Sequence, residues 1–159
     1  MTEDATFEEG GERPIRLQAL EADDLQVVSS LVQDAVLPIT EMKWEAPKRR
    51  FSMLLNRFRW EDKQAAERRS RDFERVQSVL SVHDVAKVES SGVDREDKDM
   101  ILSVLALSFT AGEDGAGRVE VTFAGDGALG FELEALDVTL ADVTRPYVAP
   151  SKKAPSHPE

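Results

Sequence analysis

Alternation of apolar and polar residues with a period of two most strongly constrains the fold of this chain. The segments that show it are 15–19, 40–44, 76–82, 101–109 and 119–123. Successive side chains of a β-strand point to opposite faces, so each segment predicts a strand with one buried face. Stretches of turn composition, such as AGEDGAG and AGDGALG, join the later segments. Parallel neighbours need a crossover of about a dozen residues or more, so these short connections predict an antiparallel sheet.

The last predicted strand changes face along its length. Its apolar residues occupy odd positions over 129–133 and even positions over 136–140. Such a slip predicts a β-bulge or a kink near Ala135.

One helix is predicted near the N-terminus, over 24–35, because apolar residues recur there at helical spacing. A second helix is a weaker prediction over 62–73. Asp34 would lie in the last turn of the first helix, where a negative charge opposes the helix macrodipole. We therefore expect Gln33 and Asp34 to meet Arg57 or Arg59 in a buried or half-buried ion pair.

These elements predict an α+β, mainly β, single domain over residues 14–146. Its expected architecture is a curved antiparallel sheet or partly closed barrel of about seven strands with one N-terminal helix. A pleckstrin-homology-like barrel is one topology of this kind, although that family closes one end with a C-terminal helix that is not predicted here. Residues 1–13 and 147–159 are predicted disordered tails, because they are polar and have few apolar groups to offset the entropy of ordering.

Composition narrows the classes of protein. The chain has no cysteine, which excludes disulfides, thiolate zinc sites and cysteine nucleophiles and fits a reducing compartment. The apolar run over 100–109 is about half of the roughly 20 residues that span a bilayer. The acidic N-terminus lacks the features of a secretory signal. We expect a cytoplasmic protein that has no membrane span and binds no cofactor.

A stretch rich in cations and aromatics, KRRFSMLLNRFRWED, occupies residues 48–62 of a chain whose net charge is −11. The segment 48–75 holds ten of the 20 basic residues and five acids. Both a strand and a helix fit the apolar pattern of the stretch. We favour the strand, because the alternating segment 40–44 needs a hairpin partner after Pro47.

The candidate binding residues of this stretch are Arg49, Arg50, Arg57, Arg59 and Trp60. Guanidinium groups grip phosphate or carboxylate, and aromatic rings offer stacking surfaces. The alternative is internal: the arginines pair with acids of the same chain, and the aromatics belong to the core. An acidic protein partner and RNA are the two external ligands considered, and RNA is less favoured because the net charge repels polyanions.

Catalytic and metal-binding patterns are weak. His83 beside Asp84 has the composition of an oriented base, but a solvated or locally hydrogen-bonded histidine is the favoured interpretation. The acids over 94–99 lack the glycine and glutamate of a calcium loop. No catalytic residue and no metal ligand is predicted, although a small carboxylate-dependent enzyme around Asp34, Glu61 and His83 is one alternative. Glu61 is also, with Asp34, a candidate for a structural ion pair.

Four segments carry a resemblance to a known family: LQALEADDLQVVSSLVQDAV, RRFSMLLNRFRWE, ERR and a terminal PSHP. Together they resemble the uncharacterised alphaproteobacterial domain-of-unknown-function family 2948, over about residues 15–146. The resemblance implies a bacterial single-domain protein with no assigned activity, and it transfers no catalytic residue. The preferred hypothesis is a non-enzymatic interaction or regulatory domain that binds a protein partner or its own copy. An RNA-binding module using 49–60 is the alternative, and the small enzyme is the second alternative.

Overall fold

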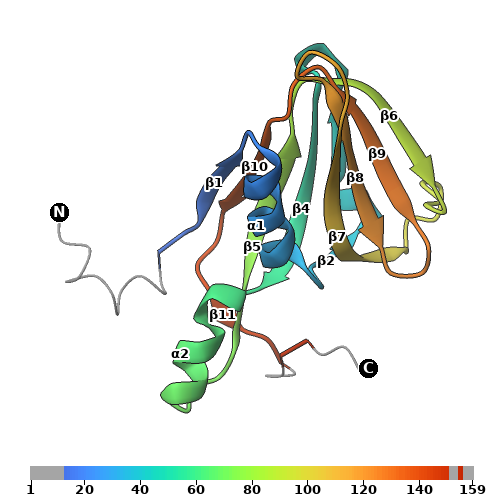
Figure 1. Ribbon diagram of the computed structural model, residues 1–159. Helices are drawn as coiled ribbons and strands as arrows, with labels where there is room; N and C mark the ends of the chain where they lie inside the picture. The colour runs from blue at the N-terminus through green and yellow to red at the C-terminus, as the bar shows by residue number, and fades with distance from the viewer. Residues whose placement is uncertain (1–12, 151–153, 156–159) are drawn as a thin grey trace.

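The computed structural model describes residues 13–150 and 154–155 of the 159-residue chain. Within this part, the fold is one antiparallel sheet of eleven strands with two short helices (Figure 1). The strands are β1 (Arg16–Ala19), β2 (Val36–Pro38), β3 (Met42–Glu45), β4 (Arg50–Phe58), β5 (Glu74–Val82), β6 (Val85–Ser91), β7 (Ile101–Ala111), β8 (Gly117–Phe123), β9 (Ala128–Leu133), β10 (Val138–Asp142) and β11 (Tyr147–Val148). The helices are α1 (Ala22–Val32) and α2 (Lys63–Arg68), and single 3₁₀ turns form η2 (Ile39–Glu41), η3 (Ala46–Lys48) and η4 (Trp60–Asp62).

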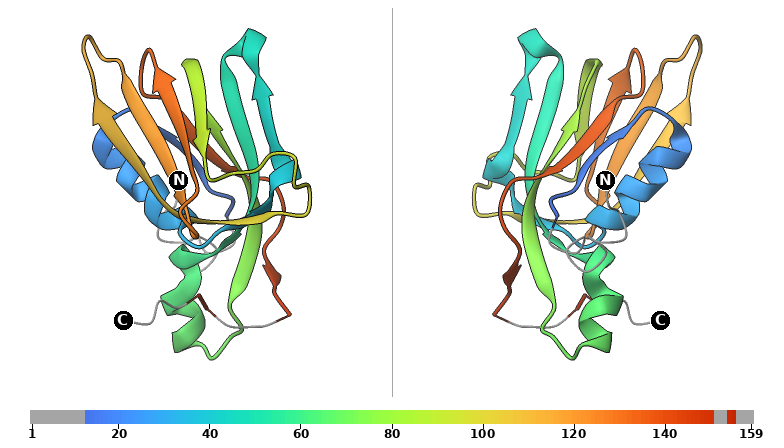
Figure 2. Two further views of the ribbon diagram at one scale, coloured as in Figure 1. Left: turned by 90° about the vertical axis from the view of Figure 1, so that its right-hand side faces the viewer. Right: turned by 90° about the vertical axis from the view of Figure 1, so that its left-hand side faces the viewer.

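The strands neighbour one another in the order β1-β10-β5-β4-β2-β7-β8-β9-β6, with β3 added to β4 and β11 added to β5. Strands β1 and β6 form the two ends of this path, so the sheet is not closed. Figure 2 shows β3 and β4 on one side of the open structure and β7 and β8 on the other. The predicted mainly β, antiparallel class is confirmed, whereas the pleckstrin-homology-like topology stays a prediction.

The prediction of about seven strands was wrong, because the structure has eleven. Strands β2 and β11 are three and two residues long, too short to show a period. Strand β6 has only one buried residue, Val85, and therefore has no apolar alternation. The single strand predicted over 129–140 is two strands, β9 and β10.

A bend in two paired strands folds the sheet over its own core. Strand β5 pairs with β10, and β6 pairs with β9. The chain passes through the bend twice, from β5 to β6 and from β9 to β10. At the bend, the His83 N–H donates to the Asp137 carbonyl at 2.9 Å, and the Glu134 N–H donates to the Asp84 carbonyl at 3.1 Å. Asp84 has a left-handed φ of 56°. The predicted kink near Ala135 is confirmed, since that residue lies in the bend between β9 and β10.

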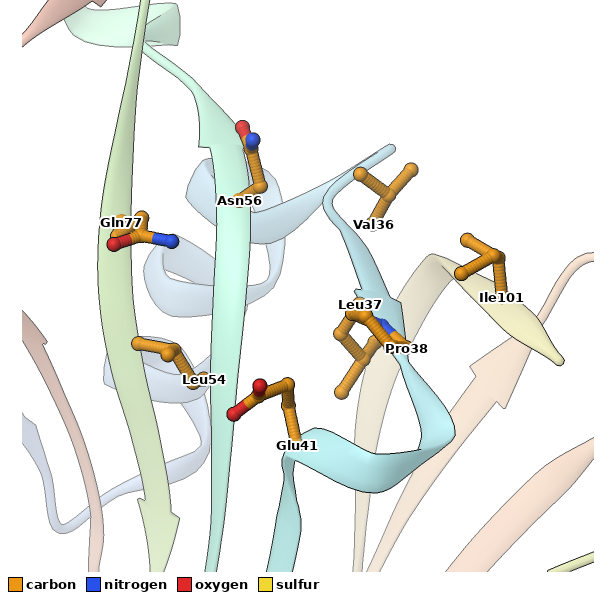
Figure 3. Close-up of a pocket in the computed structure, with 8 residues that line it drawn as sticks. All are labelled: Val36, Leu37, Pro38, Glu41, Leu54, Asn56, Gln77 and Ile101. Atoms are coloured by element: carbon orange, nitrogen blue, oxygen red, sulfur yellow. The ribbon is translucent and has the colours of Figure 1, made fainter. Parts of the chain in front are cut away.

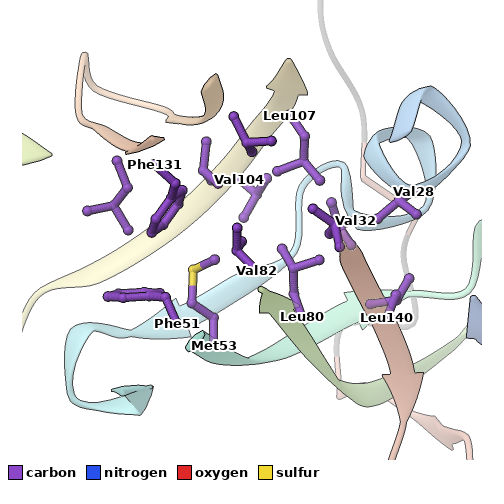
Figure 4. Close-up of a cluster of buried hydrophobic side chains, with 14 of the residues drawn as sticks. Val28, Val32, Phe51, Met53, Leu80, Val82, Val104, Leu107, Phe131 and Leu140 are labelled. Atoms are coloured by element: carbon purple, nitrogen blue, oxygen red, sulfur yellow. The ribbon is translucent and has the colours of Figure 1, made fainter. Parts of the chain in front are cut away.

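One hydrophobic cluster fills the space between the bent sheet and α1 (Figure 4). Helix α1 contributes Leu25, Val28 and Val32. Phe51 of β4 meets Phe131 of β9 across the core, with their ring centroids 5.1 Å apart. The bend therefore brings the inward faces of both halves of the sheet onto a shared core.

Both helices are shorter than predicted. Helix α1 ends at Val32 rather than at residue 35, because Asp34 adopts a left-handed φ of 64° and its N–H donates to the Val104 carbonyl of β7 at 2.8 Å. Asp34 therefore lies outside the helix and not in its last turn. None of the described helices is long and apolar enough to cross a bilayer.

The sheet extends past the predicted end of the domain. Tyr147 and Val148 form β11 and pair with Arg75 and Glu74 at the start of β5, within the stretch predicted to be a tail. The predicted N-terminal tail lies almost wholly outside the described residues.

Replacing Leu80 with alanine tests the inward face of β5. Leu80 is fully buried, so Leu80→Ala should lower the free energy of unfolding by about 2–5 kcal/mol in denaturant titration. Leu20→Ala is the control, because Leu20 is 55% exposed and its loss should change stability by less than about 0.5 kcal/mol. Equal effects of the two substitutions would contradict the assigned packing.

Candidate functional site

Strand β4 has an inward face that changes from apolar to charged along its length. Phe51, Met53 and Leu55 are buried in the core, and Arg57 occupies the next inward position with 0% of its surface exposed. The strand interpretation of this stretch is confirmed over Arg50–Phe58. The alternation of β4 therefore places a guanidinium group inside the protein.

The Arg57 guanidinium lies between two carboxylates. Its Nη1 and Nη2 donate to Oε1 and Oε2 of Glu61 in η4, both at 2.9 Å. Its Nη2 also donates to both oxygens of Asp142 in β10 at 3.0 Å. On the third side, Nε donates to Ser78 Oγ of β5 at 3.0 Å. The two-pronged contact with Glu61 uses the planar geometry that distinguishes arginine from lysine.

Asp142 accepts further hydrogen bonds from its own chain. The Ser78 hydroxyl donates to Oδ1 at 2.6 Å, and the Ile15 main-chain N–H donates to Oδ2 at 2.8 Å. Buried carboxylates are tolerated when such donors satisfy them. This side chain therefore ties β10 to β5, to β4 and to the residue before β1.

A second buried arginine, Arg59, extends the ionic contacts towards α2. Its Nη1 contacts Oε1 of Glu74 and lies 3.5 Å from Oδ2 of Asp62, and its side chain is 2% exposed. Arg71 forms a two-pronged pair with Asp62 at 2.9 and 3.0 Å. These pairs join η4 to the start of β5 and to Arg71, which follows α2.

We call this set the arginine–carboxylate network. Its members are Arg57, Arg59, Arg71, Glu61, Asp62, Glu74 and Asp142. Three cations thus face four anions of the same chain. Arg57 and Arg59 thus pair with acids of the same chain, which is the internal pairing considered as the alternative to an external ligand. An external anion would have to compete with these carboxylates.

Burial by itself would lower the pKa of the Arg57 guanidinium. The hydrogen bonds donated to Glu61 and the charges of Glu61 and Asp142 outweigh burial and raise the pKa above its ordinary value. Arg57 therefore keeps its charge, and the network keeps its cation, wherever the protein is folded.

Replacing Arg57 with alanine tests the network. Arg57→Ala would leave Glu61 and the buried Asp142 without their shared cation, so we expect a loss of about 3–5 kcal/mol in the free energy of unfolding. Arg16→Ala is the matched control, because Arg16 is exposed on β1. If chemical denaturation gave the two variants the same stability, the network would not hold the fold together.

The indole of Trp60 is held by the protein as well. Its Nε1 donates to the main-chain carbonyl of Gln33 at 3.0 Å, which joins η4 to the end of α1. Its ring lies 4.7 Å from the Phe58 ring in an edge arrangement, and Phe73 packs on Phe58 at 5.7 Å. The Gln33 main-chain carbonyl therefore meets the indole of the cationic stretch, whereas the prediction was a contact of Gln33 and Asp34 with Arg57 or Arg59. The predicted ion pair of Asp34 with Arg57 or Arg59 stays a prediction.

Arg49 and Arg50 lie at the opposite end of β4. Arg49 pairs with Glu134 at 2.8 Å, and Arg50 pairs with Glu45 at 2.8 Å. Arg50 and Arg57 lie seven positions apart on β4, or roughly 23 Å at about 3.3 Å per residue. The five residues predicted as one binding set therefore fall into two places.

The pKa of Glu134 provides a pH test of the Arg49 pair. The hydrogen bond and charge of Arg49 lower this pKa from the ordinary 4.5. Because the folded value lies below the unfolded one, the contribution of the pair to stability is present above pH 4.5 and is lost as the pH falls through the lowered value. In an NMR titration, Arg49→Gln should return the Glu134 pKa to its ordinary value, whereas the exposed Arg95→Gln should leave it lowered.

The residues of the enzymatic alternative do not gather in one site. His83 lies in the bend after β5, where its Nε2 hydrogen-bonds to Thr139 Oγ1 at 3.0 Å. Glu61 pairs with Arg57, which lies opposite Val76 near the start of β5. His83 follows the other end of the same strand, so the two groups are far apart. Across the described residues, no group of three or more histidines and acids is arranged to hold a metal ion.

The outward face of β4 and β5 carries two hollows, which we call the outer groove. One has a volume of about 330 Å³ and is lined by Val36, Leu37, Pro38, Glu41, Leu54, Asn56, Gln77 and Ile101 (Figure 3). The other has a volume of about 350 Å³ and is lined by Thr40, Glu41, Met42, Lys43, Ser52, Met53, Leu54 and Val79. They share Glu41 and Leu54, so they form one surface along the strands.

The groove was not predicted from the sequence, although the sequence contains a signal for it. Leu54 and Leu55 are adjacent, so β4 must present an apolar side chain on each face. Leu55 lies in the core and Leu54 in the groove. The other walls come from Val36 and Ile101 on strands far apart in the sequence, which periodicity within a single segment cannot bring together.

Two polar side chains on this outward face carry buried atoms without hydrogen-bond partners. They are Asn56 Oδ1 on β4 and Arg75 Nη1 on β5, and Arg59 Nη2 on the network side is the third such atom in the described part of the chain. A buried unsatisfied polar atom costs about 1–3 kcal/mol. The outward face therefore holds unused hydrogen-bonding capacity.

This fold and its site define an open antiparallel β-sheet protein in which one strand, β4, has a buried ionic network on its inward face and a groove of apolar and polar residues on its outward face. The chain belongs to the family described as protein of unknown function (DUF2948), whose profile matches residues 15–157. Searches among curated proteins and among solved structures found no significant match to this chain.

Proposed function

We propose that this protein is a non-enzymatic interaction domain that binds a protein partner through the outer groove. The observation that carries the proposal is the group of exposed apolar side chains on this outward face. Ile101 is 62% exposed and Val36 is 36% exposed, and both line the same hollow as the half-buried Leu54. Contiguous apolar surface of this kind is typical of protein interaction sites.

The charge of the groove favours a protein over a nucleic acid. Its only ionisable lining residues are Glu41 and Lys43, which balance each other. Arg57 and Arg59, which an RNA-binding surface would need, are occupied by carboxylates on the inner side of β4. A net charge of −11 also opposes the approach of a polyanion.

A different protein is favoured over a second copy of the chain. Two copies would each carry the charge of −11, and their long-range repulsion would slow association. Self-association through the groove is therefore an outcome to be tested rather than the preferred one.

The same proposal places the domain in the bacterial cytoplasm. The absence of cysteine fits a reducing compartment, and the resemblance to an alphaproteobacterial family supports a bacterial source.

A photo-crosslinking amino acid at Ile101 tests the proposed surface. In cell extract treated with nuclease, we expect a crosslinked protein adduct from Ile101 and none from the same amino acid at Val27, an exposed position of α1 (53%). Ile101→Asp should abolish capture at a second crosslinking position, Val36, because a charge in the apolar hollow opposes burial. Equal adducts from Ile101 and Val27, or capture that nuclease removes, would contradict the proposal.

A further inference from the structure

The two charged side chains of the outer groove are not shared equally by its hollows. Glu41 lines both hollows, whereas Lys43 lines only the second, so Glu41 is the one charged residue that lines the first hollow. The Glu41 side chain is exposed, and it forms no hydrogen bond or ion pair with Lys43 or with any other described residue. The first hollow therefore carries a negative charge that has no partner in the described part of the chain.

The other polar groups of the first hollow also accept hydrogen bonds. Asn56 Oδ1 is buried and has no partner among the described residues, and the Gln77 amide can either donate or accept. An ionised carboxylate such as that of Glu41 can only accept. The hollow therefore lacks a donor. Glu41 would make the first contact because it is exposed, whereas Asn56 has to turn its amide to reach an occupant.

The remaining walls of the first hollow are apolar. They are formed by Val36, Leu37, Pro38, Leu54 and Ile101. Figure 3 shows the Glu41 carboxylate directed towards β4, beside Leu54, with Val36 and Ile101 across the hollow. A side chain that fits this surface is apolar along its length and cationic at its end. Lysine and arginine are built in this way, because their aliphatic stems cover apolar surface while their charged ends stay near polar groups.

We infer that the protein partner inserts a lysine or arginine side chain into the first hollow of the outer groove. The aliphatic stem packs against Val36, Leu54 and Ile101, and the terminal cation pairs with Glu41. The inference rests on the proposed function, because it names the chemistry by which the partner occupies the same groove. It assigns Glu41 as the residue that selects the partner.

Charge complementarity favours a basic side chain over a neutral or an acidic one. At long range, the net charge of −11 attracts a basic partner. In contact, a neutral surface would cover Glu41 and remove it from water without giving it a partner, which is costly for a charged group. An acidic segment would add repulsion between like charges. A basic side chain is therefore the occupant that leaves no unpaired charge in the covered hollow.

The floor of the groove favours contact through side chains. Strand β4 pairs residue by residue with β5 from Phe51 to Phe58, so no free strand edge lies between these two strands. Addition of a partner strand by main-chain hydrogen bonds requires such an edge. The first hollow measures about 330 Å³, at the lower end of the range of about 300–1,000 Å³ for ligand pockets. This size suits an anchoring side chain with its neighbours.

Fluorescence anisotropy with the full-length protein and a library of synthetic eight-residue peptides tests the inference. Each peptide has alanine, valine, leucine and serine around one central position, which is lysine, arginine, glutamine or glutamate. We expect the lysine and arginine peptides to bind roughly fivefold more tightly than the glutamine peptides at low ionic strength. The difference should shrink at high ionic strength, because salt screens the pair with Glu41.

Variants of Glu41 assign the preference to this residue. Glu41→Gln should remove it, and Glu41→Lys should reverse it in favour of the glutamate peptides. The matched control is Glu113→Lys, which makes the same change of charge at an exposed acid between β7 and β8 and should keep the preference for lysine and arginine. Thermal unfolding of all three variants should match the unmodified protein, because both acids are exposed, so a changed preference reports on binding.

The outcomes separate the two proposals. Peptide binding that the uncharged substitution Ile101→Asn abolishes, but that shows no preference for lysine or arginine, would overturn the inference and leave the proposed function intact. A preference that survives Glu41→Gln would also overturn the inference, because the charge of the whole chain would then be its cause. Binding of no peptide would overturn the inference as well. Together with the lack of an adduct from Ile101, it would overturn both proposals.

Discussion

The pairing of Arg57 with Asp142 and Glu61 is the interaction on which this part of the fold depends. A guanidinium with no exposed surface is tolerated only when carboxylates and hydroxyls surround it, and the structure supplies them from β5, β10 and η4. The donors of Arg57 cannot be satisfied unless all of these elements are in place. The ionic contacts therefore specify how the elements meet, in addition to any stability that they contribute.

The network and the outer groove occupy opposite faces of β4. Arg57 points inward and pairs with acids of the chain, whereas Leu54 and Asn56 point outward and line the groove. Buried ion pairs on one side of a strand restrict the movement of its backbone. The groove thus lies on a strand whose backbone is restrained by the network. This restraint reduces the conformational entropy that is lost when a partner binds.

The sequence predicted the strand class well because apolar alternation is a local property. The strand over 50–58, the kink near Ala135 and the antiparallel pairing all follow from residues close together in the chain. What could not be predicted depends on contacts between distant segments. The partner of Arg57 in β10 is 85 residues away, and periodicity carries no information about which acid a buried arginine will meet. The same limit applies to the groove, whose walls at Val36 and Ile101 belong to separate segments.

The register of β1 has a consequence for how the chain folds during synthesis. Arg16 pairs with Ala141, so within the described part of the chain the first strand pairs only with β10, which is far from it in the sequence. Domains dominated by such distant pairings fold slowly, because the ends of a long loop must meet before any contact stabilises them. On the ribosome, residues 16–19 must wait unpaired until β10 has emerged, since no earlier strand substitutes for it. The N-terminal strand therefore closes the sheet rather than initiating it.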